Sequence, residues 1–297
     1  MIDTHCHLNF KAFEKDADEV IGRTLAENIW MINVGSQLET SKKAVELAGA
    51  FNAPEPRSIV AEKYPQGVFA AIGLHPGHVT GHLLKNKLDS EELAAQESVK
   101  DFNIDDYRRL ALGPGGRRVV AIGEIGLDYY YRPKGTARLE EFKNLQKRAL
   151  LAQMDLAKEL NLPIIFHCRS AHSDLIRILD ARYQILDTSF RGVVHCFAGT
   201  WKEAEEYLKL GLYIGFTGII FKQIPGIDFK EVIKKTPLDK ILVETDAPYL
   251  TPPAASPERN EPIFVKYIAE EIAKIKKLSY QEVSETTTLN ARKLFGI

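Results

Sequence analysis

The feature that most limits the folds open to this chain is a set of short apolar runs that end in a histidine or a carboxylate. The runs are rich in Val and Ile and are flanked by breaker residues, a pattern typical of strands buried on both faces. They cover residues 119–124, 163–167, 192–195 and 241–246. An ionisable group at the end of a buried strand is costly without a partner. If several of these ends converge, a cation is the natural partner.

Helical patterns separate the apolar runs. Between residues 142 and 160 apolar side chains recur every three or four positions, and a second such stripe covers 265–275. Ser279 and Glu282 form a capping-box pattern for a last helix that reaches about residue 295. Other helices are expected at 17–27, 39–50, 173–182, 202–210 and 229–234.

Further strands are expected at 1–8, 30–34, 68–74 and 212–216, which makes eight strand candidates that alternate with the helices. Eight parallel βα units in about 250 residues plus insertions predict an α/β fold of the (β/α)8 TIM-barrel type. In that fold the residues at the carboxyl ends of the strands carry the catalysis. The ionisable ends of the runs fall at this place.

The strand expected at 1–8 carries His5 and His7. Because side chains alternate between the faces of a strand, both imidazoles project to one side, roughly 7 Å apart, and can share a metal ion. Taken alone, the pair is better explained as two solvent-facing histidines of an edge strand. The other ionisable strand ends favour the metal site: Glu124, His167, His195, Glu244 and Asp246.

Composition fits one enzyme-sized domain over residues 1–297. The chain is 45% hydrophobic and 27% charged, which is ordinary for a globular protein. Its net charge of −1 excludes binding to nucleic acid by bulk charge, so phosphate recognition has to be local. We expect no membrane span, since no apolar run is long enough, and no signal peptide, since the first strand begins at residue 2.

Each of the three cysteines, Cys6, Cys168 and Cys196, lies beside a candidate ligand. A zinc–thiolate site is one interpretation, but strand alternation argues against it. If the neighbouring histidines face the lumen of a barrel, the cysteines face the helix layer and act there as small buried hydrophobic residues. Their spacing suggests no disulfide framework, so a reducing, cytoplasmic location is expected.

The order of these motifs resembles the metal-dependent amidohydrolase-like barrels and, more narrowly, the TatD family of metal-dependent deoxyribonucleases. Seven segments carry the resemblance and span the chain in order: 3–7 (DTHCH), 73–76 (GLHP), 123–129 (GEIGLDY), 167–169 (HCR), 195–199 (HCFAG), 244–250 (ETDAPYL) and 259–262 (RNEP). Such a set is far more specific than any one of its members.

The resemblance implies a centre of two divalent ions whose ligands are histidines and carboxylates at the strand ends: His5, His7 and Asp246 on one ion, His167 and His195 on the other, and Glu124 as the bridge. A glutamate can bridge because it has two oxygens. Two ions roughly 3.5–4 Å apart can clamp the attacking and leaving oxygens of a phosphoryl displacement. The mixed ligand set does not single out Mg²⁺, Mn²⁺ or Zn²⁺.

Five carboxylates receive further roles. Asp246 and Glu124 are the expected catalytic residues, and Asp246 would also accept the proton of the attacking water. Asp3 and Glu244 are assigned to a supporting position, where they orient the ligands. Asp128 is expected to be structural.

Other residues are candidates for contact with substrate. Arg169 follows His167 by two positions, so it points toward the same mouth, where its guanidinium suits phosphate; a salt bridge at the rim is the alternative. His75 is similar to a substrate-contacting histidine of the family, and a capping or core role is the alternative. His78, His82 and His172 are expected to be surface or loop residues without a role.

Two segments add to this list. The loop from 248 to 262 contains five prolines and would present Arg259 and Asn260 over the site. Arg132 follows Tyr129, Tyr130 and Tyr131, so a cation lies beside aromatic rings that could stack bases; packing is an equally good explanation of the tyrosines.

The connection at 80–118, between the third and fourth strands, is longer than expected of the family. Helices are expected near 90–100 and 104–110, followed by a glycine-rich turn at 113–116. Because the connection leaves the top of the third strand, it can cover the mouth of the site and narrow the range of substrates.

These observations lead to one functional hypothesis, a cytoplasmic metallohydrolase that cleaves phosphodiesters as a 3′→5′ exonuclease on DNA, with a preference for single strands or 3′ ends. One alternative is an ester or amide hydrolase on the same scaffold, such as a deacylase of mischarged tRNA. A more remote one is a metal-binding protein without turnover. No obligate protein partner is indicated.

Overall fold

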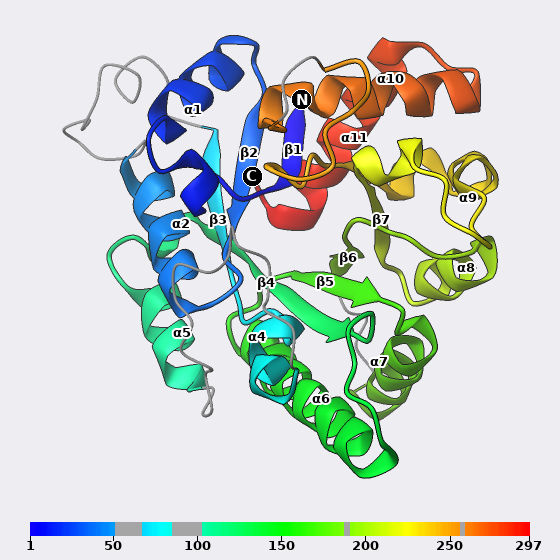
Figure 1. Ribbon diagram of the computed structural model, residues 1–297. Coiled ribbons are helices and arrows are strands. Elements are labelled where there is room, and N and C mark those ends of the chain that lie inside the picture. Colours follow the sequence, from blue (N-terminus) through cyan, green and yellow to red (C-terminus); the bar gives the residue numbers. More distant parts are fainter. Residues whose placement is uncertain (51–66, 85–102, 187–190, 256–258) are drawn as a thin grey trace.

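A computed structural model describes residues 1–50, 67–84, 103–186, 191–255 and 259–297 (Figure 1). Its strands form one parallel eight-stranded sheet in sequence order. They are β1 (Ile2–Cys6), β2 (Trp30–Val34), β3 (Val68–Ile72), β4 (Val119–Asp128), β5 (Ile164–Arg169), β6 (Gly192–Val194), β7 (Tyr213–Phe216) and β8 (Ile241–Val243).

The sheet closes where the segment after β8 meets the end of β1. Cys6 and Ala247 form a parallel bridge, and the His7 amide donates to the Ala247 carbonyl at 2.8 Å. Helices surround the strands, as Figure 1 shows. The α/β fold of the (β/α)8 TIM-barrel type that the sequence predicts is therefore confirmed.

The α-helices are α1 (Ala17–Ala26), α2 (Leu38–Ala50), α4 (Pro76–Thr80), α5 (Ile104–Leu112), α6 (Thr136–Glu159), α7 (His172–Leu186), α8 (Trp201–Lys209), α9 (Phe229–Lys235), α10 (Val265–Lys276) and α11 (Tyr280–Phe295). Short 3-10 turns are η1 (Lys11–Phe13), η2 (Gly81–Leu83), η4 (Gly116–Arg118), η5 (Gly218–Phe221), η6 (Leu238–Lys240) and η7 (Pro262–Phe264). Within the described residues, no helix is both long enough and apolar enough to cross a membrane.

The predicted elements occur where the sequence places them, with shifted ends. β4 runs four residues past Glu124 because its last residues pair with β5, up to the match of Asp128 with Arg169. In the long connection after β3, the helix expected at 104–110 is α5. The Asn103 side chain caps its amino end, where Asn103 Oδ1 accepts a hydrogen bond from the Asp105 amide at 3.1 Å. The helix expected near 90–100 lies outside the described residues.

Two apolar clusters fill the protein. The larger one lies between the strands and the helices. The smaller one draws at least one residue from each strand and fills the barrel, including Ile2, Ile32, Phe69, Ala121, Ile165, Val193, Tyr213 and Leu242. Its members from α11, Ala291, Leu294 and Phe295, close the amino-terminal end of the barrel. The lumen is thus apolar at that end, which leaves the carboxyl ends of the strands for polar side chains.

Bulges decide which residues of β1 and β4 face the lumen. Ile2 belongs to the inner cluster and Cys6 to the outer one, although strict alternation would put both on one face. The pairing of β1 with β2 shifts register between Asp3 and Cys6, and the pairing of β4 with β5 shifts between Ile122 and Ile125. An extra residue re-aims the side chains that follow it. These two irregularities turn the functional ends of both strands inward.

Helix α11 is tied to the start of β8 by one buried side chain. The Asn290 amide donates to the carbonyls of Leu238 and Ile241, both at 2.9 Å. The capping box predicted at Ser279 and Glu282 is present at the start of this helix. Asn290 thereby holds the helix that closes the barrel.

We predict that Asn290→Ala lowers the free energy of unfolding by about 1–3 kcal/mol, because two carbonyls lose their donor in a buried place. Urea denaturation followed by circular dichroism would measure the change. Lys293→Ala is the control, since Lys293 is exposed on the same helix, and should change stability by less than about 0.5 kcal/mol. Equal effects of the two substitutions would contradict the role given to Asn290.

Candidate metal centre

A pocket of about 490 Å³ opens at the carboxyl ends of the strands. Among the residues that line it are histidines and carboxylates from widely separated strands: His7, His75, Glu124, Asp128, His167, His195 and Asp246. The residues that the sequence marks at the strand ends are therefore brought together at one place.

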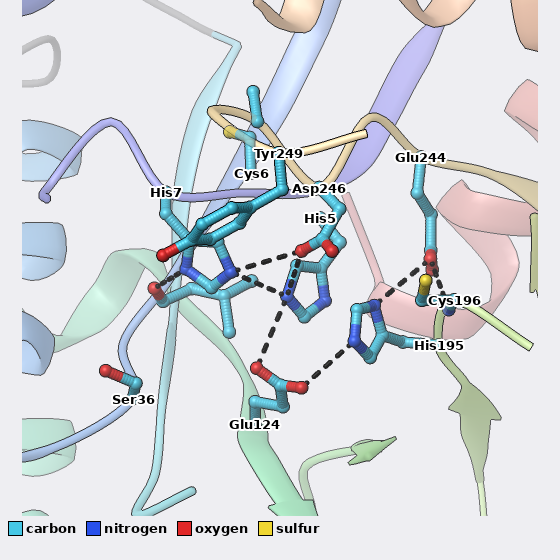
Figure 2. A network of polar contacts seen from close by, with 12 residues as sticks. His5, Cys6, His7, Ser36, Glu124, His195, Cys196, Glu244, Asp246 and Tyr249 are labelled. Atoms are coloured by element: carbon cyan, nitrogen blue, oxygen red, sulfur yellow. Dashed lines mark hydrogen bonds and ion pairs between the residues drawn. The ribbon is translucent and has the colours of Figure 1, made fainter. Parts of the chain in front are cut away.

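His5, His7 and Asp246 form the first group, of which His7 and Asp246 line the pocket and His5 is fully buried. The Nε2 atoms of the two histidines are 3.2 Å apart, and Asp246 Oδ1 lies 3.3 Å from His7 Nε2 and 3.8 Å from His5 Nε2 (Figure 2). His7 Nδ1 donates to the Val34 carbonyl at 2.8 Å. That hydrogen bond leaves the lone pair of His7 on Nε2, which faces the other two side chains.

Glu124 lies between this group and a second group, which consists of His75, His167 and His195. Its Oε2 is 3.7 Å from His5 Nε2. Its Oε1 is 2.5 Å from His167 Nδ1, 3.0 Å from His195 Nε2 and 3.8 Å from His75 Nε2. The two oxygens of one carboxylate thus face two different sets of imidazoles, which is the geometry that a bridging ligand requires.

The charges of the pocket favour a cation. Burial by itself would raise the pKa of Glu124, but His195, His75 and His167 hold it well below its ordinary value. The pKa of Asp246 is likewise lowered, since His7, His195 and His5 outweigh its burial. For His167 burial would lower the pKa, yet Glu124 and Asp128 raise it to about 9. Carboxylates that hold a proton on a buried imidazole also attract a metal ion.

Three sets of side chains have ligand atoms that all lie within 4.8 Å of one another: His5, His7 and Asp246; His5, Glu124 and His195; and His75, Glu124 and His167. Imidazole nitrogen and carboxylate oxygen suit divalent ions such as Zn²⁺ and Mn²⁺. The residues present therefore fit divalent metal. The last set also places His75, which directly follows the strand expected at 68–74, among the possible ligands.

Asp3 holds the end of β1 against the segment after β8. Its carboxylate accepts hydrogen bonds from the His5 amide at 3.2 Å, the Thr245 amide at 2.9 Å and the Thr245 hydroxyl at 2.5 Å. The next residue, Asp246, has a left-handed backbone with φ of 58°, and its amide donates to the His5 carbonyl at 2.8 Å. These contacts position Asp246 beside His5, although Asp246 is not part of a strand.

Glu244 supports His195 from the other side (Figure 2). Its Oε2 accepts from the Cys196 amide at 3.0 Å and lies 3.4 Å from His195 Nδ1, while the Thr4 hydroxyl donates to Oε1 at 3.3 Å. Gly215 of β7 makes room for this carboxylate, because a Cβ there would lie 2.3 Å from Oε1. Gly215 is not among the residues predicted from the sequence, where its only signal is a glycine inside a strand.

The cysteines do not all behave as expected. Cys6 and Cys168 are buried in the outer cluster, facing the helices. Cys196 instead lines the pocket, with its Sγ 3.1 Å from Thr217 Oγ1. The prediction for Cys196 is wrong because β6 ends at Val194 and Cys196 has a left-handed backbone with φ of 44°, so strand alternation no longer applies.

The remaining histidines divide differently from the prediction. His75 caps α4, its Nδ1 accepting from the Gly77 amide at 3.1 Å, and also faces Glu124. His82 is exposed, as expected. His78 and His172 are buried, which contradicts their assignment to the surface. His172 reaches the Tyr207 hydroxyl at 3.0 Å and the Ala198 carbonyl at 3.2 Å, and so connects α7 with α8.

Asp128 was expected to be structural, and it also belongs to the pocket. Its Oδ2 lies 3.3 Å from His167 Nε2 and accepts from Arg169 Nε at 2.9 Å. Arg169 therefore stands at the mouth, as its spacing from His167 predicts, and makes the ion pair that was its alternative. A guanidinium has five N–H donors, so a pair with one carboxylate oxygen leaves others for substrate.

The structure places three other candidates away from the pocket. Arg259, expected over the site, is paired with Asp16 at 2.6 Å and with Glu261 at 3.3 Å, and lies over the Phe13 ring. Asn260 is buried, and its amide donates to the Thr245 carbonyl at 2.9 Å. Both hold the loop after β8 in place and do not line the pocket. Arg132 is exposed and is not among the pocket residues either.

A parallel (β/α)8 barrel with buried histidines and carboxylates at the carboxyl ends of its strands is typical of metal-dependent hydrolases. The chain belongs to the TatD-related DNase family, whose sequence profile matches residues 2–296. It is accordingly a metal-dependent hydrolase that acts on ester bonds. This confirms the resemblance seen in the sequence motifs.

Individual relatives agree along their whole length. The chain is 36% identical to the uncharacterised metal-dependent hydrolase YabD of Bacillus subtilis, over 100% of this chain and 99% of the relative. It is 34% identical to the 3′-5′ ssDNA/RNA exonuclease TatD of Citrobacter rodentium, over 100% and 98%. The crystal structure of YjjV, a TatD homologue from Escherichia coli, aligns over 100% and 98% of the two chains with a TM-score of 0.73 and 30% identity.

We predict that Glu124→Gln weakens the binding of divalent metal by at least about tenfold. The side-chain amide is neutral, so its atoms are weaker ligands than the carboxylate oxygens for metal bound at either group. Titration calorimetry with Mn²⁺ and Zn²⁺ on the metal-free protein would measure it. Glu205→Gln, at an exposed carboxylate on α8, should bind metal like the wild type. Unchanged metal affinity in Glu124→Gln would show that Glu124 is not a ligand.

Proposed function

We propose that this protein is a 3′→5′ exonuclease that hydrolyses single-stranded DNA with the help of two divalent ions. The observation that carries the proposal is the position of Glu124. One oxygen faces His5 of the first group, and the other faces the imidazoles of the second group. A carboxylate in this position can serve two ions at once.

In this proposal His5, His7 and Asp246 hold one ion, and His167 and His195 hold the other, with Glu124 between them. His75 faces the same Glu124 oxygen and is available to the second ion or to the substrate phosphate. When bound, the ions would polarise the phosphate and lower the pKa of a water molecule. Mn²⁺ and Zn²⁺ suit the many imidazoles, and Mg²⁺ remains a candidate.

The chain's own residues supply the rest of the reaction. The oxygen of a water molecule attacks phosphorus, the bond from phosphorus to the 3′ oxygen of the preceding nucleotide breaks, that oxygen takes up a proton from solvent, and a nucleoside 5′-monophosphate is released. Asp246 accepts the proton of the water, since its carboxylate is ionised and lies in the pocket. Arg169 contributes a positive charge to the phosphate at the mouth. Asp3 and Glu244 keep the two groups in place.

Two further observations support a single nucleic-acid strand as substrate. The relative from Citrobacter rodentium, 34% identical, is named a 3′-5′ ssDNA/RNA exonuclease. The pocket of about 490 Å³ suits a nucleotide-sized group. With a net charge of −1, the chain has no general attraction to DNA, so binding depends on the pocket and its rim.

We predict that the purified protein shortens a 5′-labelled single-stranded oligonucleotide from its 3′ end when Mg²⁺, Mn²⁺ or Zn²⁺ is added, and that EDTA stops the reaction. Denaturing electrophoresis would show a ladder of shortened products. Asp246→Asn should lower kcat by at least about 100-fold, whereas His82→Ala, at an exposed histidine, should be as active as the wild type. Release of amino acid from mischarged tRNA without cleavage of DNA would overturn the proposal.

We also predict that Arg169→Ala keeps its metal and loses about 1.5–3 kcal/mol in kcat/KM on single-stranded DNA, as expected for a charge-assisted contact. Arg169→Lys should recover only part of this, because an ammonium cannot reproduce the planar fork. The salt dependence of single-strand binding should flatten by about 0.7 in log–log slope in the alanine variant. If Arg169→Ala binds single-stranded DNA with unchanged affinity and unchanged salt dependence, Arg169 does not contact the substrate and its role is limited to the ion pair with Asp128.

A further inference from the structure

We propose that Tyr130, Tyr131 and Arg169 form a stacking platform for a nucleobase at the rim of the pocket, and this inference rests on the proposed function. The two tyrosines are among the most exposed large hydrophobic side chains of the described residues, at 59% and 53%. Tyr129, directly before them, is 7% exposed and packs near Phe142. The tyrosine run thus divides into one packing residue and two that face solvent.

The exposed rings form one unit with Arg169. Tyr130 and Tyr131 meet edge to face, with ring centroids 4.8 Å apart. The Arg169 guanidinium carbon lies 4.7 Å from the centre of the Tyr130 ring and 5.6 Å from that of Tyr131. Cations at this distance are attracted to the face of a ring, so the contact orders side chains that would otherwise move in solvent.

Asp128 connects this unit to the metal centre. Its Oδ1 accepts from the Tyr130 amide at 2.9 Å, and its Oδ2 accepts from Arg169 and lies 3.3 Å from His167 Nε2. Tyr131 and Arg169 line the same pocket as His167. A substrate whose phosphate reaches the imidazoles can therefore place a neighbouring base against the tyrosines.

The chemistry of the rim selects a ligand with a flat π system beside an anion. Every nucleobase has such a face, and stacking on aromatic side chains tolerates any sequence. The positive charge of Arg169 favours the phosphate that accompanies the base. The platform would therefore strengthen the binding of strands that contain bases, without a preference for one base. It would not strengthen the binding of an abasic strand.

The test compares an ordinary single-stranded oligonucleotide with one whose last 3′ residues are abasic. The wild type should cleave the ordinary strand with a kcat/KM at least tenfold higher than the abasic one. Tyr131→Ala and Tyr130→Ala should lose most of this advantage, mainly through KM, so that each variant has a similar kcat/KM on the two strands. Tyr131→Phe should keep the advantage, because its ring remains.

Tyr280→Ala is the matched control, since Tyr280 is a tyrosine on α11 that is 43% exposed and is not among the residues that line the pocket. It should behave like the wild type on both strands. If the wild type prefers the ordinary strand and the Tyr130 and Tyr131 variants prefer it equally, the platform is overturned while the nuclease function stands.

A binding experiment separates the platform from the reaction. The fluorescence of an oligonucleotide with 2-aminopurine near its 3′ end should be quenched on binding to metal-free wild-type protein, and Tyr131→Ala should remove the quenching. If the wild type cleaves neither strand, the proposed exonuclease function fails, and this readout alone decides the platform. Quenching that persists in both alanine variants would overturn it.

Discussion

The arrangement of the metal centre depends on the contacts between the buried carboxylate of Glu124 and the imidazoles around it. A negative charge inside the mouth of a barrel is costly unless opposite charge surrounds it. Imidazoles from four places along the chain face it: His5, His75, His167 and His195. They meet here because all strands run in one direction and end at one rim of the parallel barrel. The same charge makes this rim attractive to divalent cations.

Side chains outside this group determine how closely it can assemble. Asp3 and Asn260 both bind Thr245. The Thr245 amide and hydroxyl donate to the Asp3 carboxylate, and the Asn260 side-chain amide donates to the Thr245 carbonyl. This holds Asp246 beside His5 although the strand has already ended at Val243. Gly215 leaves the space that the Glu244 carboxylate needs beside His195. The geometry of the pocket therefore rests on hydrogen bonds and close approaches between segments distant in sequence.

Strand alternation predicted the orientation of some site residues correctly, but alternation alone does not explain that orientation. Alternation along a strand placed His5 and His7 inward and Cys6 outward, as the structure has them, but Ile2 also faces inward. A bulge between them changes the face, and no local pattern in the sequence marks it. The same alternation failed for Cys196, which follows the end of its strand. Periodicity describes regular elements, and functional residues here lie where the elements end.

The sequence by itself determined the order of strands and helices, the barrel and the family, because hydrophobic periodicity and short motifs are local properties of the chain. It also determined which residue types stand at the strand ends. Only the tertiary structure decided which of them share the pocket: Asp128 and Cys196 line it, whereas Arg259 pairs with Asp16. The tertiary structure likewise divided the tyrosines into one that packs and two at the rim. Such choices depend on contacts between residues far apart in sequence, which exist only once the barrel has closed.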